Sequence, residues 1–193
     1  MFIDGGDLYY VVAVTLTKTN LIEKVNRISE IVNPVIDVEA MSLSDYKDYK
    51  ISQIKEEVQA DIFAGTDIEL SSGETETFQF TLEDQSNISN LYMTILSGGG
   101  QIPSLPFHSH GNYCRQYPAA DIVKIYVEMQ KLITLKTTIA NFTIQKVREC
   151  EDKSSVDEIY YGMEFDETTQ SQIQSIYEGT LSVIDTMMES FSI

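Results

Sequence analysis

The densest group of side chains able to do chemistry lies where His108-Ser109-His110 is followed by Cys114. Alternate residues of an extended segment point to the same side, so the two histidines could chelate one metal ion. Three such pairs around a trimer axis would supply six nitrogen ligands, so a metal held between chains stays open. Within one chain no second Cys or His cluster completes a site. We therefore expect no metal and no cofactor, and a rival hypothesis is a metal-dependent hydrolase built on these three residues.

Other kinds of catalysis lack the residues that they need. A nucleophile requires a neighbouring base and an oxyanion donor, and nothing around Cys114 resembles a known nucleophile motif. Gly98-Gly99-Gly100 lacks the Lys-Ser/Thr that follows a phosphate-binding loop. Acidic pairs such as Glu56-Glu57 fall on expected helix surfaces, and 30 acidic residues make such pairs common. We expect a protein that is not an enzyme.

A row of apolar residues near the C-terminus is the other candidate site. Its members follow one another at intervals of four and three residues, as in a heptad seam. Such a row either packs on the chain's own domain or docks on a neighbouring subunit, and the spacing favours neither. Tyr and Phe are frequent anchors of protein interfaces. The candidate partner-binding residues are Tyr177, Leu181, Ile184, Met188 and Phe191.

Hydrophobic periodicity predicts a small β-containing N-terminal portion over residues 1–42. Alternation over residues 7–17 predicts a strand, and apolar spacings of three and four predict a helix over 20–31. Asn33-Pro34 ends that helix, and residues 35–41 read as a second strand.

Helices are expected to dominate residues 43–193. Apolar residues spaced by three and four predict a helix from Ser42 or Ser44 to about Phe63, with a stop at Gly65. Its expected buried stripe is Ile51, Ile54, Val58 and Ile62.

A strand is expected over residues 76–81, before a helix that begins with a capping box of Thr81 and Asp84 and ends near Leu96. Residues 101–118 contain three of the four prolines and should form a loop with at most one hairpin.

The longest helix is expected over about residues 119–150, which contain no proline and no glycine. A last helix should begin near Thr168. The fold class is therefore α+β, with a small β-containing N-terminal portion followed by a mainly helical domain. The broad buried stripe expected on the longest helix is Ile122, Ile125, Tyr126, Met129, Leu132, Ile133, Ile139, Phe142 and Val147.

Composition limits the classes of partner. A net charge of −17 repels phosphate and anionic lipid, so we expect binding neither to nucleic acid nor to membranes. The longest apolar run has six residues, against about 20 for a membrane span, and no basic secretory leader is present. Cys114 and Cys150 match no disulfide framework. We expect a soluble protein with reduced thiols, made in cytosol.

Several short motifs follow one another over about residues 43–180. They are Leu43–Ile51 with Lys55, Phe78–Thr81 leading into Asp84–Ile88, Pro106-Phe107-His108, Gly111, Cys114-Arg115, Tyr117, Tyr126, Thr137-Thr138 with Asn141, and Ile159–Gly162. In this order, the motifs resemble small tail proteins of phages of Gram-positive gut bacteria.

This resemblance implies a structural protein of the virion tail, from the baseplate or fibre region, made in the bacterial host cytoplasm. It implies contacts with other phage tail subunits, a homo-oligomer, and no catalytic residues. The alternative is a tail-fibre assembly chaperone that is absent from the mature particle. His110 stands where the family usually has an acidic residue, so the histidine pair inherits no role. Residues 1–42 are not covered.

Overall fold

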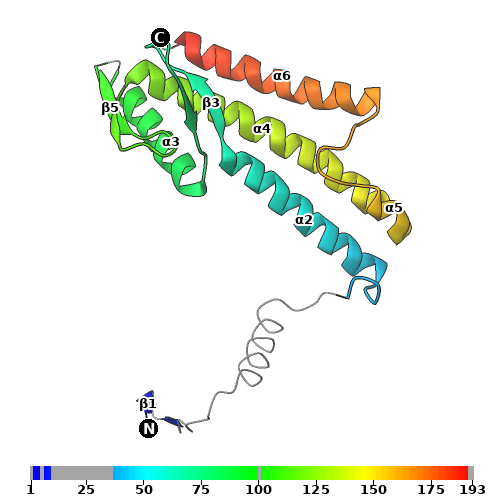
Figure 1. Ribbon diagram of the computed structural model, residues 1–193. Coiled ribbons are helices and arrows are strands. Elements are labelled where there is room, and N and C mark those ends of the chain that lie inside the picture. The colour runs from blue at the N-terminus through cyan, green and yellow to red at the C-terminus, as the bar shows by residue number, and fades with distance from the viewer. Residues whose placement is uncertain (1, 5–6, 10–36, 100, 191–193) are drawn as a thin grey trace. The chain divides into compact units, whose positions relative to one another are not determined.

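The structure is a computed structural model that describes residues 2–4, 7–9, 37–99 and 101–190, with side chains from 37–99 and 101–186. The chain divides into two units, Met1–Met41 and Ser42–Ile193, which are treated separately below. The fold is α+β with a helical bulk, and Figure 1 shows its elements.

In the first unit, strand β1 (Phe2–Asp4) pairs antiparallel with strand β2 (Asp7–Tyr9). The strand predicted over residues 7–17 is therefore present at its start, and its remainder lies outside the described residues, as does the helix predicted over 20–31. The strand predicted over 35–41 is wrong for residues 37–41, which form a turn and a bend. There the Asp37 carboxylate accepts a hydrogen bond from the amide of Ala40, at 3.2 Å, which bends the backbone out of an extended course.

Helix α2 (Leu43–Ala64) begins as predicted at a serine cap. The Ser42 hydroxyl accepts a hydrogen bond from the amide of Asp45 at 3.2 Å, which satisfies one of the unpaired amides of the first turn. The predicted stripe of Ile51, Ile54, Val58 and Ile62 is buried. Spacings of three and four place these side chains on one side of the helix.

Gly65 ends α2 at a position where any side chain would clash with the neighbouring backbone. Its φ is +75°, in the region that favours glycine, and a β-carbon would stand 1.7 Å from the carbonyl oxygen of Phe78. The chain then turns directly into the antiparallel hairpin of β3 (Thr66–Glu69) and β4 (Thr75–Phe78). The strand predicted over 76–81 ends early at Phe78, since the Phe80 amide turns to the carbonyl of Phe63.

Helix α3 (Leu82–Ser97) has the capping box that the sequence predicts. The Asp84 amide donates to the Thr81 hydroxyl at 3.2 Å, while the Asp84 carboxylate accepts from the Thr81 amide at 3.2 Å. Ile88, Tyr92 and Ile95 form its buried face.

Residues 101–118 contain one hairpin, within the limit set by the sequence. Strand β5 (Ser104–Phe107) pairs antiparallel with β6 (Arg115–Pro118). The two hairpins share an aromatic cluster, in which the Phe78 ring lies 6.2 Å from Phe107 and 5.7 Å, edge-on, from Tyr117. All three rings are buried, so this cluster fixes one hairpin against the other.

Helix α4 (Ala119–Glu149) is the element around which the second unit is built, and the predicted range of 119–150 is confirmed. In Figure 1 it runs between α2 and α6, with α3 beside its first half. Its first half is buried on more than one side, as expected of a helix surrounded by other elements. The residues buried there are Asp121, Ile122, Val123, Ile125, Val127 and Met129.

The predicted stripe of α4 is only partly right. Ile122, Ile125, Met129 and Val147 are buried, whereas the others are half-buried. The buried set also contains small and polar residues that a search for large apolar side chains passes over. These are Thr138, Ala140 and Thr143.

A short helix that was not predicted, α5 (Lys153–Asp157), follows α4 and is capped by Asp152. The segment after α5 contacts α2 through Tyr161, whose hydroxyl donates to the Asp61 carboxylate of α2 at 3.0 Å. The same carboxylate forms an ion pair with Lys136 of α4 at 2.6 Å. The hydrogen bond from Lys136 lowers the pKa of Asp61 against the opposing effect of burial.

Helix α6 (Glu167–Ser190) ends the described chain, and its start agrees with the predicted Thr168 within one residue. Ile173 and Ile184 are buried, and the Phe142 ring of α4 meets Phe165 edge-on at 6.5 Å. No helix among the described residues is long and apolar enough to cross a membrane.

Candidate functional site

The histidines and the cysteine of residues 108–114 lie in the loop between β5 and β6, at the surface. The His108 ring stacks on Phe107 at 5.2 Å, and its Nε2 atom is 3.8 Å from the Asp84 carboxylate. His110 and Cys114 are exposed. Among the described residues, no three His, Cys, Asp or Glu side chains gather in an arrangement that would hold a metal ion. The charged neighbour of His108 is Asp84.

His108 and Cys114 do share a hollow of about 310 Å³ with Leu91 and the amides of Asn87 and Asn90. For a thiol nucleophile, the imidazole would have to stand against the sulfur while a carboxylate orients it. The carboxylate next to His108, that of Asp84, is used to cap α3, where the Thr81 hydroxyl donates to it at 2.6 Å. The arrangement of Asp84 therefore serves the fold.

A second group of polar side chains, which the sequence did not reveal, centres on Glu76 of β4. Its carboxylate accepts a hydrogen bond from the Tyr117 hydroxyl at 2.7 Å and pairs with the Arg115 guanidinium. Arg115 also lies over the Tyr117 ring, 4.5 Å from its centre. Glu76 and Arg115 are 39 residues apart, so only the pairing of the hairpins brings them together.

The charge of Glu76 is stabilised by these neighbours. Burial alone would raise the pKa of the Glu76 carboxyl, but hydrogen bonds from Tyr117 and Ser109 and the nearby Arg115 charge outweigh it and lower the pKa. Ser109 is itself buried and accepts a hydrogen bond from the Asn112 side chain at 2.8 Å. Glu76 therefore ties β4, β6 and the 108–114 loop into one unit.

The candidate partner-binding row on α6 divides between described and undescribed residues. Ile184 is buried at 8% exposure and belongs to the core, while Tyr177 and Leu181 are half-buried. Ile184 therefore packs on its own domain, whereas Tyr177 and Leu181 keep part of their surface open to solvent. Met188 and Phe191 lie outside the residues whose side chains are described.

The side of α6 next to its buried stripe carries apolar residues that face solvent. Ile176 is 49% exposed and Val183 is 60% exposed. At about 100° per residue they lie roughly a quarter turn from the buried stripe, with Gly179 between them. We call Ile176, Gly179 and Val183 the α6 apolar flank. Its signal in the sequence is the seven-residue spacing of two β-branched residues.

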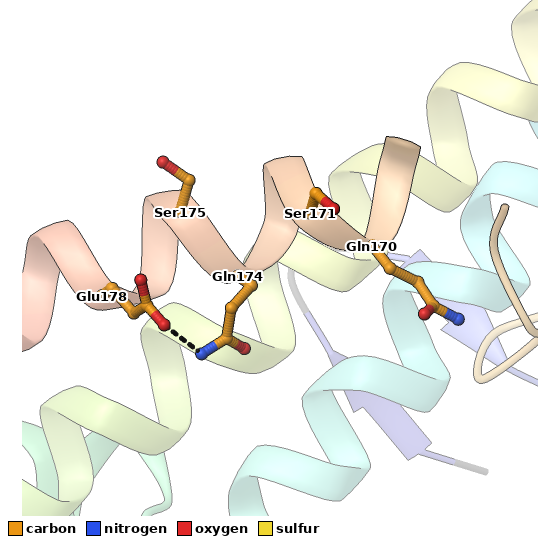
Figure 2. A pocket seen from close by; sticks show the side chains of 5 residues that line it. All are labelled: Gln170, Ser171, Gln174, Ser175 and Glu178. Carbon is orange, nitrogen blue, oxygen red and sulfur yellow. Dashed lines mark hydrogen bonds between the residues drawn. The ribbon is translucent and has the colours of Figure 1, made fainter. Parts of the chain in front are cut away.

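The side of α6 that lies across the buried stripe from the apolar flank is polar, as Figure 2 shows. A shallow hollow there is lined by Gln170, Ser171, Gln174, Ser175 and Glu178, all from this one helix. The Gln174 amide donates to the Glu178 carboxylate at 2.8 Å, so two of these groups satisfy each other. The helix thus has a polar flank and an apolar flank on either side of its buried stripe.

Comparison with known proteins gives no relative to transfer a function from: no family model, no curated protein and no solved structure matches this chain.

Proposed function

We propose that this chain is a structural component of a bacteriophage tail, from the baseplate or fibre region, and that it acts by contact with other tail subunits and not by catalysis. The proposal joins the ordered motifs of residues 43–180 with one structural observation, the exposed α6 apolar flank. Single exposed apolar residues need no explanation. Two of them at heptad spacing, on a helix whose buried face is already occupied, match the surface that a partner helix needs.

The charge of α6 favours a partner other than a second copy of this helix. Its acidic residues are Glu167, Glu178, Asp185 and Glu189, and it contains no Lys or Arg. Two such helices side by side would repel, since like charges across an interface are unfavourable. The surface that fits is an apolar one bordered by Lys or Arg on a neighbouring tail subunit.

The decisive experiment follows incorporation into phage particles. Wild-type chain and the double variant Ile176→Asp, Val183→Asp are supplied to infected cells that lack the native copy, and purified particles are analysed by quantitative mass spectrometry. We expect the wild type in the particles and a loss of about tenfold or more for the variant, since a buried unpaired carboxylate costs several kcal/mol.

The matched control is Ser175→Asp, Ser182→Asp, which adds the same charge at the same spacing on exposed positions of the same helix. It should incorporate like the wild type. A wild-type chain that is needed for infectious particles yet absent from them would instead support the assembly chaperone. A chain that is neither present nor needed would overturn both readings.

A further inference from the structure

An open groove of about 350 Å³ lies between the turn that joins β3 to β4 and the loop that joins β5 to β6. It is separate from α6 and has no part in the function proposed above. We call it the hairpin groove, and it is lined by Glu74, Glu76, Asn112, Tyr113, Cys114 and Arg115.

The most exposed large side chain of the groove is Tyr113, at 96%. The loop that carries it is held in place on β4, because the His110 amide donates to the Thr77 carbonyl at 2.8 Å. Gly111, with a φ of +74°, makes the turn, and the Asn112 side chain is tied to Ser109. The ring is thus presented to solvent by a loop whose backbone is already ordered, which lowers the entropic cost of binding.

The polar groups of the groove are flat and of different kinds. Glu74 offers a carboxylate, Arg115 a guanidinium, and Asn112 an amide that keeps one donor and one acceptor beyond its bond to Ser109. Such planar groups can each make two parallel hydrogen bonds. Together they present both donors and acceptors beside an aromatic face, which is what adjacent hydroxyl groups on an apolar ring require.

Charge narrows the class of ligand. Glu76 and Arg115 neutralise each other, so the groove keeps a formal charge of about −1, that of Glu74. An anion would meet Glu74 within a protein of net charge −17. A cation would find the Glu76 oxygens already occupied by Tyr117 and Arg115, which leaves it the single carboxylate of Glu74. We propose that the hairpin groove binds a neutral saccharide, with one sugar ring on Tyr113 and its hydroxyls on Glu74, Asn112 and Arg115.

The test is a titration of the isotope-labelled full chain, followed by NMR, with a panel of neutral oligosaccharides of glucose, galactose, mannose, rhamnose and N-acetylhexosamines. One shallow site should bind at least one of them with a dissociation constant on the order of 1 mM, which shifts the signals of residues 111–115. Tyr113→Ala should weaken that binding about tenfold, as loss of an anchoring aromatic does, and Tyr113→Phe should retain it.

The matched control is Tyr160→Ala, which removes an exposed tyrosine outside the groove and should leave the affinity unchanged. The Ile176→Asp, Val183→Asp variant should also keep full binding. The proposal is overturned if no saccharide of the panel shifts any signal at concentrations up to about 50 times the expected dissociation constant of ~1 mM. It is also overturned if the shifted signals belong to residues outside 111–115. It is equally overturned if trilysine, and no saccharide, perturbs residues 111–115.

Discussion

At the scale of single residues, the surrounding atoms restrict which residue can stand at two positions, 65 and 84. Gly65 must keep its φ of +75° without meeting the carbonyl of Phe78, and Asp84 must cap α3 while it stands 3.8 Å from His108. Neither requirement concerns chemistry on a ligand. Both lie where a helix meets a β-hairpin: Gly65 between α2 and β3, and Asp84 in the first turn of α3, which follows β4.

Gly65→Ala should therefore destabilise the protein more than an ordinary substitution at a turn. A backbone with φ +75° and ψ −152°, a combination essentially confined to glycine, costs an alanine about 1–3 kcal/mol. The clash with the Phe78 carbonyl adds about 1–3 kcal/mol of strain. The free energy of unfolding from urea titration should fall by about 2–6 kcal/mol, the sum of the two. Gly73→Ala, with a φ of +86° and nothing within 4 Å, should cost only the backbone part. Equal losses for the two variants would show that the clash is relieved by a small shift.

At the scale of elements, local signals predicted what local interactions decide. The Ser42 cap, the Thr81–Asp84 capping box and the uninterrupted run of α4 are each contained within a few turns of chain. Strand β3 was not predicted, because its four residues include one buried side chain, Ile68, and so show no alternation of apolar and polar residues. The Glu76–Arg115 contact escaped because it depends on the pairing of two hairpins.

The orientation of α6 shows the same limit. The heptad row from Tyr177 to Phe191 and the stripe at Ile173, Tyr177 and Ile184 overlap, and both have helical spacing. Which side packs on α4 is decided by Ile173 and Phe165, near the start of the helix. The periodicity therefore predicted the apolar row that includes the buried Ile184, but it could not tell whether that row packs on the chain's own domain or on a neighbouring subunit.

The stability that Glu76 contributes to the contact between the two hairpins should depend on pH. Because the folded pKa of this carboxyl is lowered, its charge stabilises the folded state at pH values above the unfolded pKa of about 4.3, and this contribution is lost as pH falls through the folded pKa. Glu76→Gln should thus be clearly less stable than the wild type at pH 7, with a difference that shrinks towards pH 3. Urea unfolding at pH 7, 5 and 3 measures it. The control is Glu74→Gln, which changes an exposed neighbouring carboxylate. If the stability difference between Glu76→Gln and the wild type stays constant with pH, Glu76 acts by its shape and not by its charge.

At the scale of the second unit, α4 is the element that contacts the other long helices and both hairpins. It packs against α2, α3 and α6, and its start anchors the β3–β4 hairpin, since the Asp121 carboxylate accepts from the Ser71 amide at 2.8 Å. One hydrophobic core runs through these contacts. The two surfaces proposed to bind other molecules, the α6 apolar flank and the hairpin groove, are therefore carried by one cooperative framework.

Ile125→Asp tests that cooperativity. Ile125 is fully buried in the first half of α4, where a carboxylate without a partner costs several kcal/mol against a total stability of about 5–15 kcal/mol.

The Tyr92 and Tyr126 rings, stacked at 4.0 Å between α3 and α4, give a near-ultraviolet signal for tertiary packing. Helical circular dichroism reports α2, α4 and α6. If α4 unites the unit, both signals should be lost together, at a midpoint many degrees below that of the wild type. Ile176→Asp, which places the same charge on an exposed position of α6, should leave both midpoints within a few degrees. Loss of the tyrosine signal with only a partial loss of the helical signal would mean that the half of the unit around α3 and the hairpins unfolds separately from α2 and α6.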